Sequence, residues 1–208
     1  CNASFGYFGG GHTPSPYHST VDRIDYSNDT ATAVAKGPLS VARSELAATG
    51  NASFGYFGGG ETKSTVDRID YSNDTATASP KGPLSLARGY VSATGNASFG
   101  YFGGGGTSPV RTTVDRIDYS NDTATAAAKG PLNTARWGHG ATGNADFGYF
   151  GGGPNPGLST VDRIDYSNDT ATASPKGPLS ATSFGGAATG SASFGYFALG
   201  YLKTTISR

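Results

Sequence analysis

Short runs of strand-forming residues, separated by glycine and Asn-Asp turns, recur along the whole chain. In the second copy of this pattern, residues 45–49 precede a Gly-Asn pair, and the aromatic run 53–57 follows it. A third run, residues 65–71, has apolar residues on both faces, and a Ser-Asn-Asp turn leads from it into the small residues 75–78. Aromatic and β-branched residues favour strands, and Asn-Asp pairs favour hairpin turns. The pattern therefore predicts four short antiparallel strands in each copy, and the sequence shows no helical periodicity.

This four-strand pattern is a tandem repeat. Copies of the segment STVDRIDYSNDTATA begin at Ser19, Ser64, Thr112 and Ser159, with Thr replacing Ser in the third, so successive copies start 45, 48 and 47 residues apart. We expect one repeat domain over residues 1–208, with units at roughly 1–49, 50–94, 95–142 and 143–189 and a partial fifth unit at 190–208. A lone unit of this size cannot bury both faces of its sheet, so each unit is expected to pack on its neighbours.

The order of the motifs resembles the kelch repeat. The resemblance rests on Tyr56 to Gly60, Asp70-Tyr71, Pro83-Leu84 and Arg88, with the same positions in the other copies. It implies an all-β fold: a kelch-type β-propeller built from four-stranded antiparallel repeats of about 47 residues. About five blades are expected, of which the first and the last are incomplete.

The amino-acid sequence of the repeats is also similar to that of repeats in virion structural and tail-fibre proteins of marine bacteriophages, especially phages of cyanobacteria. The segments that carry this likeness are GYFGGG and TVDRIDYSNDTATA. The resemblance implies a virion or extracellular location and no catalytic residue.

The ends of the chain suggest an excerpt of something longer. The sequence contains no Met, and Cys1 occupies the place that Gly50, Gly95 and Gly143 hold in the other copies. We expect a processed chain or part of a longer array. The alternative is a ring that closes by pairing its two incomplete blades.

Two connections in each unit differ between copies, and alternate connections of an antiparallel meander emerge at the same edge. The segment after the glycine run reads HTPSPYH, ETK, GTSPVR and PNPGL, and the segment after the Arg position reads SELA, GYVS, WGHG and FGGA. Exposed loops vary where nothing packs on them, but aromatic, His and Arg side chains are typical of binding hot spots. We therefore predict a recognition surface. Its candidate ligand-binding residues are His12, Tyr17, His18, Glu45, Glu61, Lys63, Tyr90, Val110, Arg111, Trp137, His139, Asn155, Leu158 and Phe184.

Composition narrows the classes of partner. Fifteen Lys and Arg residues balance fifteen Asp and Glu residues, so the chain lacks the positive charge that binds nucleic acid. No apolar run approaches the roughly 18 residues of a membrane span, and the N-terminus lacks a signal-peptide pattern. One Cys excludes a disulfide framework or a multi-Cys metal site. We expect no nucleic acid, membrane, cofactor or metal partner.

The repeated acidic residues offer the main candidate chemistry. Asp22, Asp25 and Asp29, with their copies, could form paired acids or a calcium site. Their spacing lacks the Gly and the terminal Glu of a helix-loop calcium site, and a catalytic pair belongs in one special environment, not in four copies. We expect turn formers and inter-blade partners of Arg23, Arg68, Arg116 and Arg163.

The sequence thus favours a non-enzymatic structural and recognition module, such as a receptor-binding part of a phage fibre, tail or extracellular appendage. Its expected partner is a host-surface glycan or protein, or a neighbouring subunit. Two alternatives stay open. One is a propeller enzyme acting on glycans, of glycosidase or lyase type, which would need unlike polar residues near the axis. The other is a subunit that only assembles into filaments.

Overall fold

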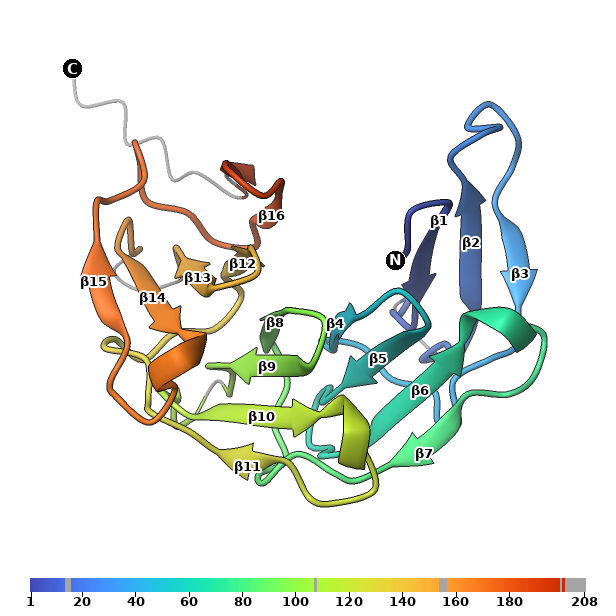
Figure 1. The fold of residues 1–208 in the computed structure, drawn as a ribbon, viewed down its shortest axis with the longest axis horizontal. Coiled ribbons are helices and arrows are strands. Elements are labelled where there is room, and N and C mark those ends of the chain that lie inside the picture. Colours follow the sequence, from blue (N-terminus) through green and yellow to red (C-terminus); the bar gives the residue numbers. More distant parts are fainter. Residues whose placement is uncertain (14–15, 107, 154–156, 199, 201–208) are drawn as a thin grey trace.

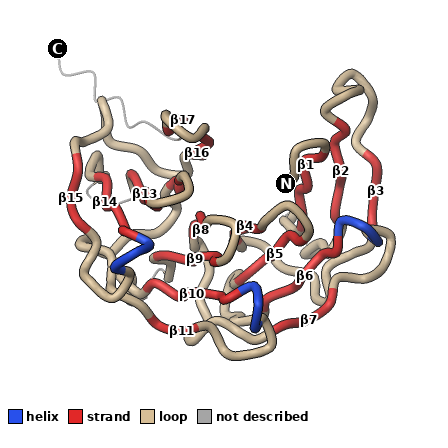
Figure 2. Tube along the Cα trace, in the orientation of Figure 1, coloured by secondary structure: helices blue, strands red, loops and turns tan. Residues whose placement is uncertain are grey.

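The chain forms an open arc of small antiparallel sheets, one after another (Figure 1). The computed structural model describes residues 1–13, 16–106, 108–153, 157–198 and 200. Strands and loops make up nearly all of this part of the chain (Figure 2), and its helices are single 3-10 turns. No helix in these ranges is long and apolar enough to cross a membrane.

The described residues form five antiparallel sheets in chain order. The first contains β1 (Phe5–Gly9), β2 (Val21–Asp25) and β3 (Val34–Lys36). The second contains β4 (Ala47–Gly50), β5 (Phe54–Gly58), β6 (Val66–Asp70) and β7 (Ser79–Lys81). The third contains β8 (Ser92–Gly95), β9 (Phe99–Gly103), β10 (Val114–Asp118) and β11 (Ala127–Ala128). The fourth contains β12 (Gly140–Gly143), β13 (Phe147–Gly151), β14 (Val161–Asp165) and β15 (Ser174–Lys176). The fifth contains β16 (Ala187–Gly190) and β17 (Gly195–Ala198).

The arrangement of the sheets is β-propeller-like. Each four-stranded sheet keeps its strands in chain order, with the first strand on the inner side of the arc and the fourth on the outer side (Figure 1). Neighbouring sheets meet through their inner strands, since β8 contacts both β4 and β12. The all-β, four-stranded antiparallel prediction is confirmed. A ring of five blades is not, because among the described residues no strand of the first sheet pairs with the fifth.

The fourth strand differs from the sequence prediction. It lies at Ser79–Lys81 in the second sheet, not at residues 75–78. The Thr-Ala-Thr-Ala segment instead contacts the preceding sheet, where the Ala78 N–H donates to the Pro38 carbonyl at 2.8 Å. The Gly37 N–H donates to the Asp74 carbonyl at 2.9 Å. These β-compatible residues therefore join two sheets rather than extend one. A 3-10 turn directly follows the third strand of the second, third and fourth sheets. These turns are Tyr71–Asn73, Tyr119–Asn121 and Tyr166–Asn168.

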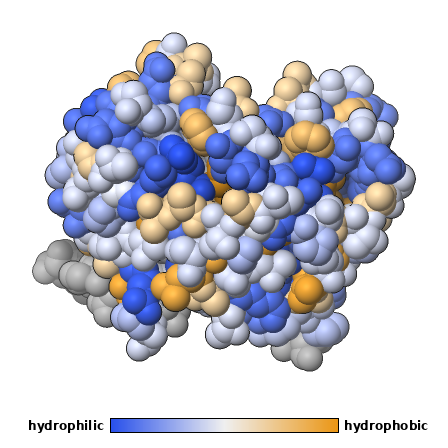
Figure 3. Space-filling view, turned by 60° about the horizontal axis from the view of Figure 1, so that its bottom comes forward, coloured by the Kyte–Doolittle hydropathy of each residue, from blue (hydrophilic) through white to orange (hydrophobic). Residues whose placement is uncertain are grey.

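The hydrophobic core lies between neighbouring sheets. Phe102 of the third sheet is fully buried against the second, and a Cβ on Gly58 would lie 2.6 Å from its ring. Only glycine permits this close approach of a strand to the ring. Tyr56, Val66 and Ile117 belong to the same cluster. Apolar residues on the face shown in Figure 3 are scattered among polar ones, as expected where the core lies inside the sheet interfaces.

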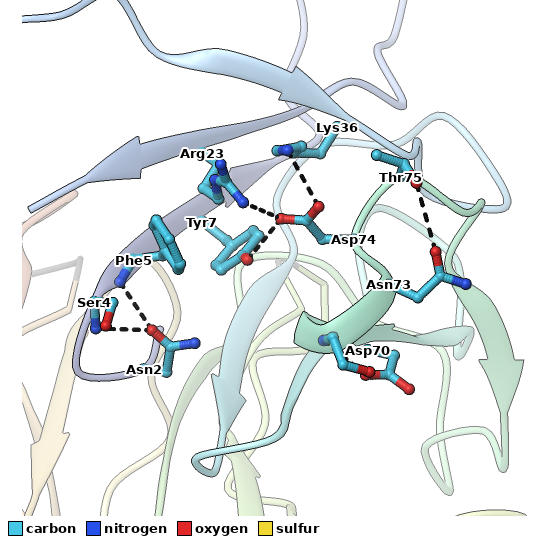
Figure 4. A network of polar contacts seen from close by, with 11 residues as sticks. Asn2, Ser4, Phe5, Tyr7, Arg23, Lys36, Asp70, Asn73, Asp74 and Thr75 are labelled. Carbon is cyan, nitrogen blue, oxygen red and sulfur yellow. Dashed lines mark hydrogen bonds and ion pairs between the residues drawn. The ribbon is translucent and has the colours of Figure 1, made fainter.

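Side-chain ion pairs tie the first four sheets to one another. Asp74 of the second sheet accepts from Tyr7 Oη at 2.9 Å and Arg23 Nη1 at 2.8 Å, and Lys36 Nζ lies 3.2 Å from its other oxygen (Figure 4). Burial acts to raise the pKa of Asp74, but these three partners outweigh it and lower the pKa. Asp122 and Asp169 repeat the arrangement with Arg68 and Arg116. The predicted inter-sheet pairing of these arginines is therefore confirmed.

Arg163 is the exception among the four repeated arginines. Its guanidinium lies 4.1 Å from the centroid of the Phe147 ring, as its three equivalents lie over theirs. Within the described ranges it forms no ion pair. The arginine stacks on its own sheet whether or not the acidic partner is present.

Candidate ligand-binding edge

The two variable connections of each repeat lie side by side, as the meander topology predicted. The residue at the Arg position donates its backbone N–H to the loop that follows the glycine run. These bonds run from Arg43 to His18, Arg88 to Lys63, Arg136 to Arg111 and Ser183 to Leu158, at 3.1 to 3.2 Å. Both variable segments therefore share one edge of the arc, which we call the variable edge.

On the inner side of the variable edge, four loops form a continuous backbone chain. We call residues 44–46, 89–91, 137–139 and 184–186 the rim. The Tyr90 N–H donates to the Glu45 carbonyl at 2.8 Å, Gly138 to Tyr90 at 3.2 Å, and Gly185 to Gly138 at 2.7 Å. These four residues have φ values of 60°, 55°, 55° and 68°. One loop position thus links four successive sheets through its backbone alone.

The rim carries a row of aromatic rings from three sheets. Tyr90 and Trp137 meet edge to face at 4.8 Å between centroids, and Trp137 meets Phe184 in the same way at 4.8 Å. All three side chains are half-buried. Gly138 makes room for the row, because a Cβ there would lie 2.6 Å from the Phe184 ring. The structure thus brings together three of the predicted site residues.

Two carboxylates join this row. Among the described residues, positive φ at a non-glycine residue occurs at Glu45, Glu61 and Tyr90, all on the variable edge. Each such residue stores about 1 kcal/mol or more of backbone strain. The Ser44 N–H donates to Glu61 Oε1 at 3.1 Å. The pKa of Tyr90 is raised by the Glu45 carboxylate beside the Tyr90 hydroxyl, by burial and by nearby Tyr17. Glu45, Glu61 and Tyr90 therefore belong to one site.

The first long loop also lies on the variable edge. His12 and Tyr17 pair across a single β-bridge, with ring centroids 6.2 Å apart, and both are exposed. Thr13 Oγ1 lies 3.4 Å from Nε2 of His18. The equivalent loops of the other sheets carry Lys63, Val110, Arg111 and Leu158, which are half-buried. Asn155, also a predicted site residue, lies outside the described residues.

His139 is not displayed on the edge, which corrects its prediction as a surface residue. Its side chain is 4 % exposed, and its ring lies 5.8 Å from that of Phe150. Burial, with Arg136 nearby, lowers the pKa of His139 to about 3. The equivalent residues Leu46 and Val91 are apolar, and they are the sequence signal that this position points into the core.

Buried arginines hold the rim from below, a role that the sequence did not reveal. Arg43 Nη1 lies 2.7 Å from Asp67 Oδ2, and both side chains are fully buried. Arg43 also donates to the Gly59 and Phe57 carbonyls at 2.9 and 3.0 Å. Ser40 Oγ donates to the second Asp67 oxygen at 2.6 Å. Every polar atom of this pair is thereby satisfied, and the loop that follows Arg43 is fixed in place.

The inner wall of the arc repeats one residue. The second position of the inner strands β4, β8, β12 and β16 is occupied by Ala48, Ala93, Ala141 and Ala188. These alanines are exposed or half-buried, whereas the flanking Ser92, Thr94 and Thr142 are buried between sheets. Ser92 Oγ, for example, donates to the His139 carbonyl. The wall is therefore small, apolar and alike in all four sheets.

Four-stranded antiparallel sheets repeated around an arc, with variable loops on one edge, define a β-propeller-like protein. Among solved structures, one described as the structure of YjhT is similar, with a TM-score of 0.73 and 13 % sequence identity. The similarity covers 91 % of this chain and 67 % of that chain. No protein-family model matches the chain, and no curated protein does. At this identity the likeness concerns the fold alone.

Proposed function

We propose that this chain is a non-enzymatic, kelch-type recognition module. In this proposal, constant sheets carry the variable edge, which binds a host-surface glycan or protein, or a neighbouring subunit. The module would belong to a phage fibre or tail, or to another extracellular appendage. The kelch and phage assignments rest on the sequence motifs of the repeats, and the recognition role rests on the rim.

The aromatic row is the observation that carries the proposal. Three large rings, Tyr90, Trp137 and Phe184, come from loops that vary between repeats, and they meet at one place. Trp and Tyr are enriched among residues that dominate binding energy. Strained residues also gather where a ligand is held, and Glu45, Glu61 and Tyr90 are such residues.

The character of the inner wall supports binding rather than turnover. A catalytic centre brings together unlike polar groups with perturbed environments. The inner wall instead repeats alanine, and the repeated aspartates engage in structural pairs such as Arg43 with Asp67 and Arg23 with Asp74. The two connections that vary most in sequence and length between sheets lie on the variable edge.

A glycan array, combined with an assay for glycan cleavage, tests the proposal. We expect binding without turnover. The four rim segments should then be replaced by one common three-residue sequence, Gly-Gly-Val, on the unchanged sheets. Loss of array binding in this variant supports recognition through the rim, and unchanged binding overturns it. Turnover of a bound glycan would favour the enzyme instead. Filaments in electron micrographs of concentrated protein, without array binding, would favour assembly.

A further inference from the structure

We infer that the rim binds an alkylammonium group, held between the aromatic row and the carboxylates of Glu45 and Glu61. The inference deepens the proposed function and rests on it, because it names the chemistry that the variable edge recognises. Ring packing, charge and the state of the nearby cations each support it.

The rings of the rim pack differently from the three tyrosine pairs at the sheet interfaces. At the sheet interfaces, Tyr pairs such as Tyr56 with Tyr119 are stacked, with interplanar angles of 18°, 14° and 11°. Stacked rings cover one another's faces. In the rim, the angles are 65° between Tyr90 and Trp137 and 69° between Trp137 and Phe184. In an edge-to-face pair, the ring that contributes its edge keeps both faces uncovered by its partner, and a cation is attracted to such an aromatic face.

The charge of the rim favours a cation. Within the four rim segments the ionisable carboxylate is Glu45, and Glu61 reaches in from the neighbouring loop to the Ser44 N–H. No Lys or Arg of the described residues forms an ion pair within 4.0 Å of either carboxylate. A positive group placed here would gain both carboxylates and the rings, whereas an anion would be repelled.

The cations closest to the rim along the chain are already neutralised. Arg43, Arg88 and Arg136 lie beneath the loops, each paired with a buried Asp at 2.7 to 3.0 Å. Their charge is therefore compensated within the scaffold. The negative charge of Glu45 and Glu61 remains for a ligand, next to the aromatic surface that an alkylated ammonium group requires.

Choline and its uncharged isostere 3,3-dimethyl-1-butanol test the inference with the intact chain, by calorimetric or NMR titration. The two probes have the same shape and differ in charge. We expect choline to bind about tenfold more tightly, as cation–π attraction at a partly desolvated site predicts. Equal binding, binding of the isostere alone, or no binding of either overturns the inference.

Variants locate the binding. Glu45→Gln keeps the shape of the side chain and should weaken choline binding about tenfold. Trp137→Ser introduces the residue that stands at the equivalent position 44, and it should abolish binding. Its folding is checked by thermal unfolding. Tyr26→Ala removes an exposed tyrosine that is not in the variable loops and serves as the control. Unchanged binding in Glu45→Gln, or loss in the control, counts against the site.

Failure here can be separated from failure of the proposed function. If array ligands bind, lose affinity in Trp137→Ser and are not displaced by choline, the recognition role stands and the ammonium inference falls. If choline displaces the array ligand, both are supported.

Discussion

The two edges of the arc join neighbouring sheets by different means. On the edge opposite the rim, the constant Gly-Asn turns join the sheets through a side chain: Asn51 accepts from the Ser53 and Phe54 N–H groups, and its amide donates to the Ala97 carbonyl of the next sheet. On the rim the joint is backbone to backbone, from the Tyr90 N–H to the Glu45 carbonyl. A side-chain joint fixes the residue, whereas a backbone joint leaves the side chain free. The difference explains how one scaffold keeps one edge nearly constant while the other varies.

The buried arginines beneath the first three rim loops are the part of the variable edge that cannot vary freely. Arg88→Met removes the partner of Asp115, which is fully buried. An uncompensated buried charge costs about 3–5 kcal/mol, so we expect a loss of that size in the free energy of unfolding. Denaturant unfolding measures it.

Arg68→Met is the matched control for this variant. It removes a partly exposed arginine, and Asp122 keeps Tyr56 and Lys81. We expect a loss of about 1 kcal/mol. Equal losses in Arg68→Met and Arg88→Met would contradict the distinction between the scaffold below the rim and the outer joints.

His139 makes the stability of the fourth sheet depend on pH. Its folded pKa of about 3 lies below the unfolded value of 6.5, so between these values the unfolded chain binds the proton. Neutral His139 contributes fully to the free energy of unfolding above pH 6.5. Below pH 6.5 this free energy falls by up to about 1.4 kcal/mol for each pH unit. The unfolding free energy at pH 7 and at pH 5 should therefore differ by about 2 kcal/mol.

His139→Leu, which copies Leu46, should flatten the unfolding free energy over this pH window. The hydrogen bonds from Ser72 lower the pKa of Asp70 below 3.8, so this carboxylate titrates at lower pH than the window. The same slope in His139→Leu and in the parent chain would show that His139 is not the titrating group.

Gly138 tests how far the rim tolerates change. Gly138→Ala places a Cβ against the Phe184 ring at a residue with φ of 55°. We expect a loss of about 2 kcal/mol in the free energy of unfolding, from strain and from displacement of the ring. Gly185→Ala has the same strain, with φ of 68°, but its Cβ would meet nothing within 4 Å. It should cost about 1 kcal/mol. A smaller loss in Gly138→Ala than in Gly185→Ala would contradict the interlocked rim.

The sequence predicted the features set by residues that recur in every repeat, and it missed the features set by contacts with a neighbouring sheet. Repeat length, antiparallel strands and the pairing of Arg23 with the next unit followed from residues that recur in fixed order. The fourth strand was misplaced because residues 75–78 bind the preceding sheet, and strand propensity does not reveal a partner. The positive φ of Glu45 and Tyr90 had a usable signal, since the equivalent residues in the next two loops are glycines.

The smallest expected effect concerns a scaffold joint that has diverged. In the fourth sheet, Asn133 replaces the serine that binds the second oxygen of the buried aspartate. Asp162 Oδ1 is buried and has no hydrogen-bond partner, while the equivalent oxygen of Asp115 accepts from Ser85 Oγ. Asn133→Ser should restore the bond and raise the free energy of unfolding by about 1 kcal/mol. Ser85→Asn, the reverse change in the third sheet, should lower it by a similar amount. Changes of opposite sign in the free energy of unfolding of these two variants, measured with denaturant, would show that a serine at this position stabilises the buried aspartate in both sheets. A destabilised Asn133→Ser would show that the fourth sheet has adapted to its own residue.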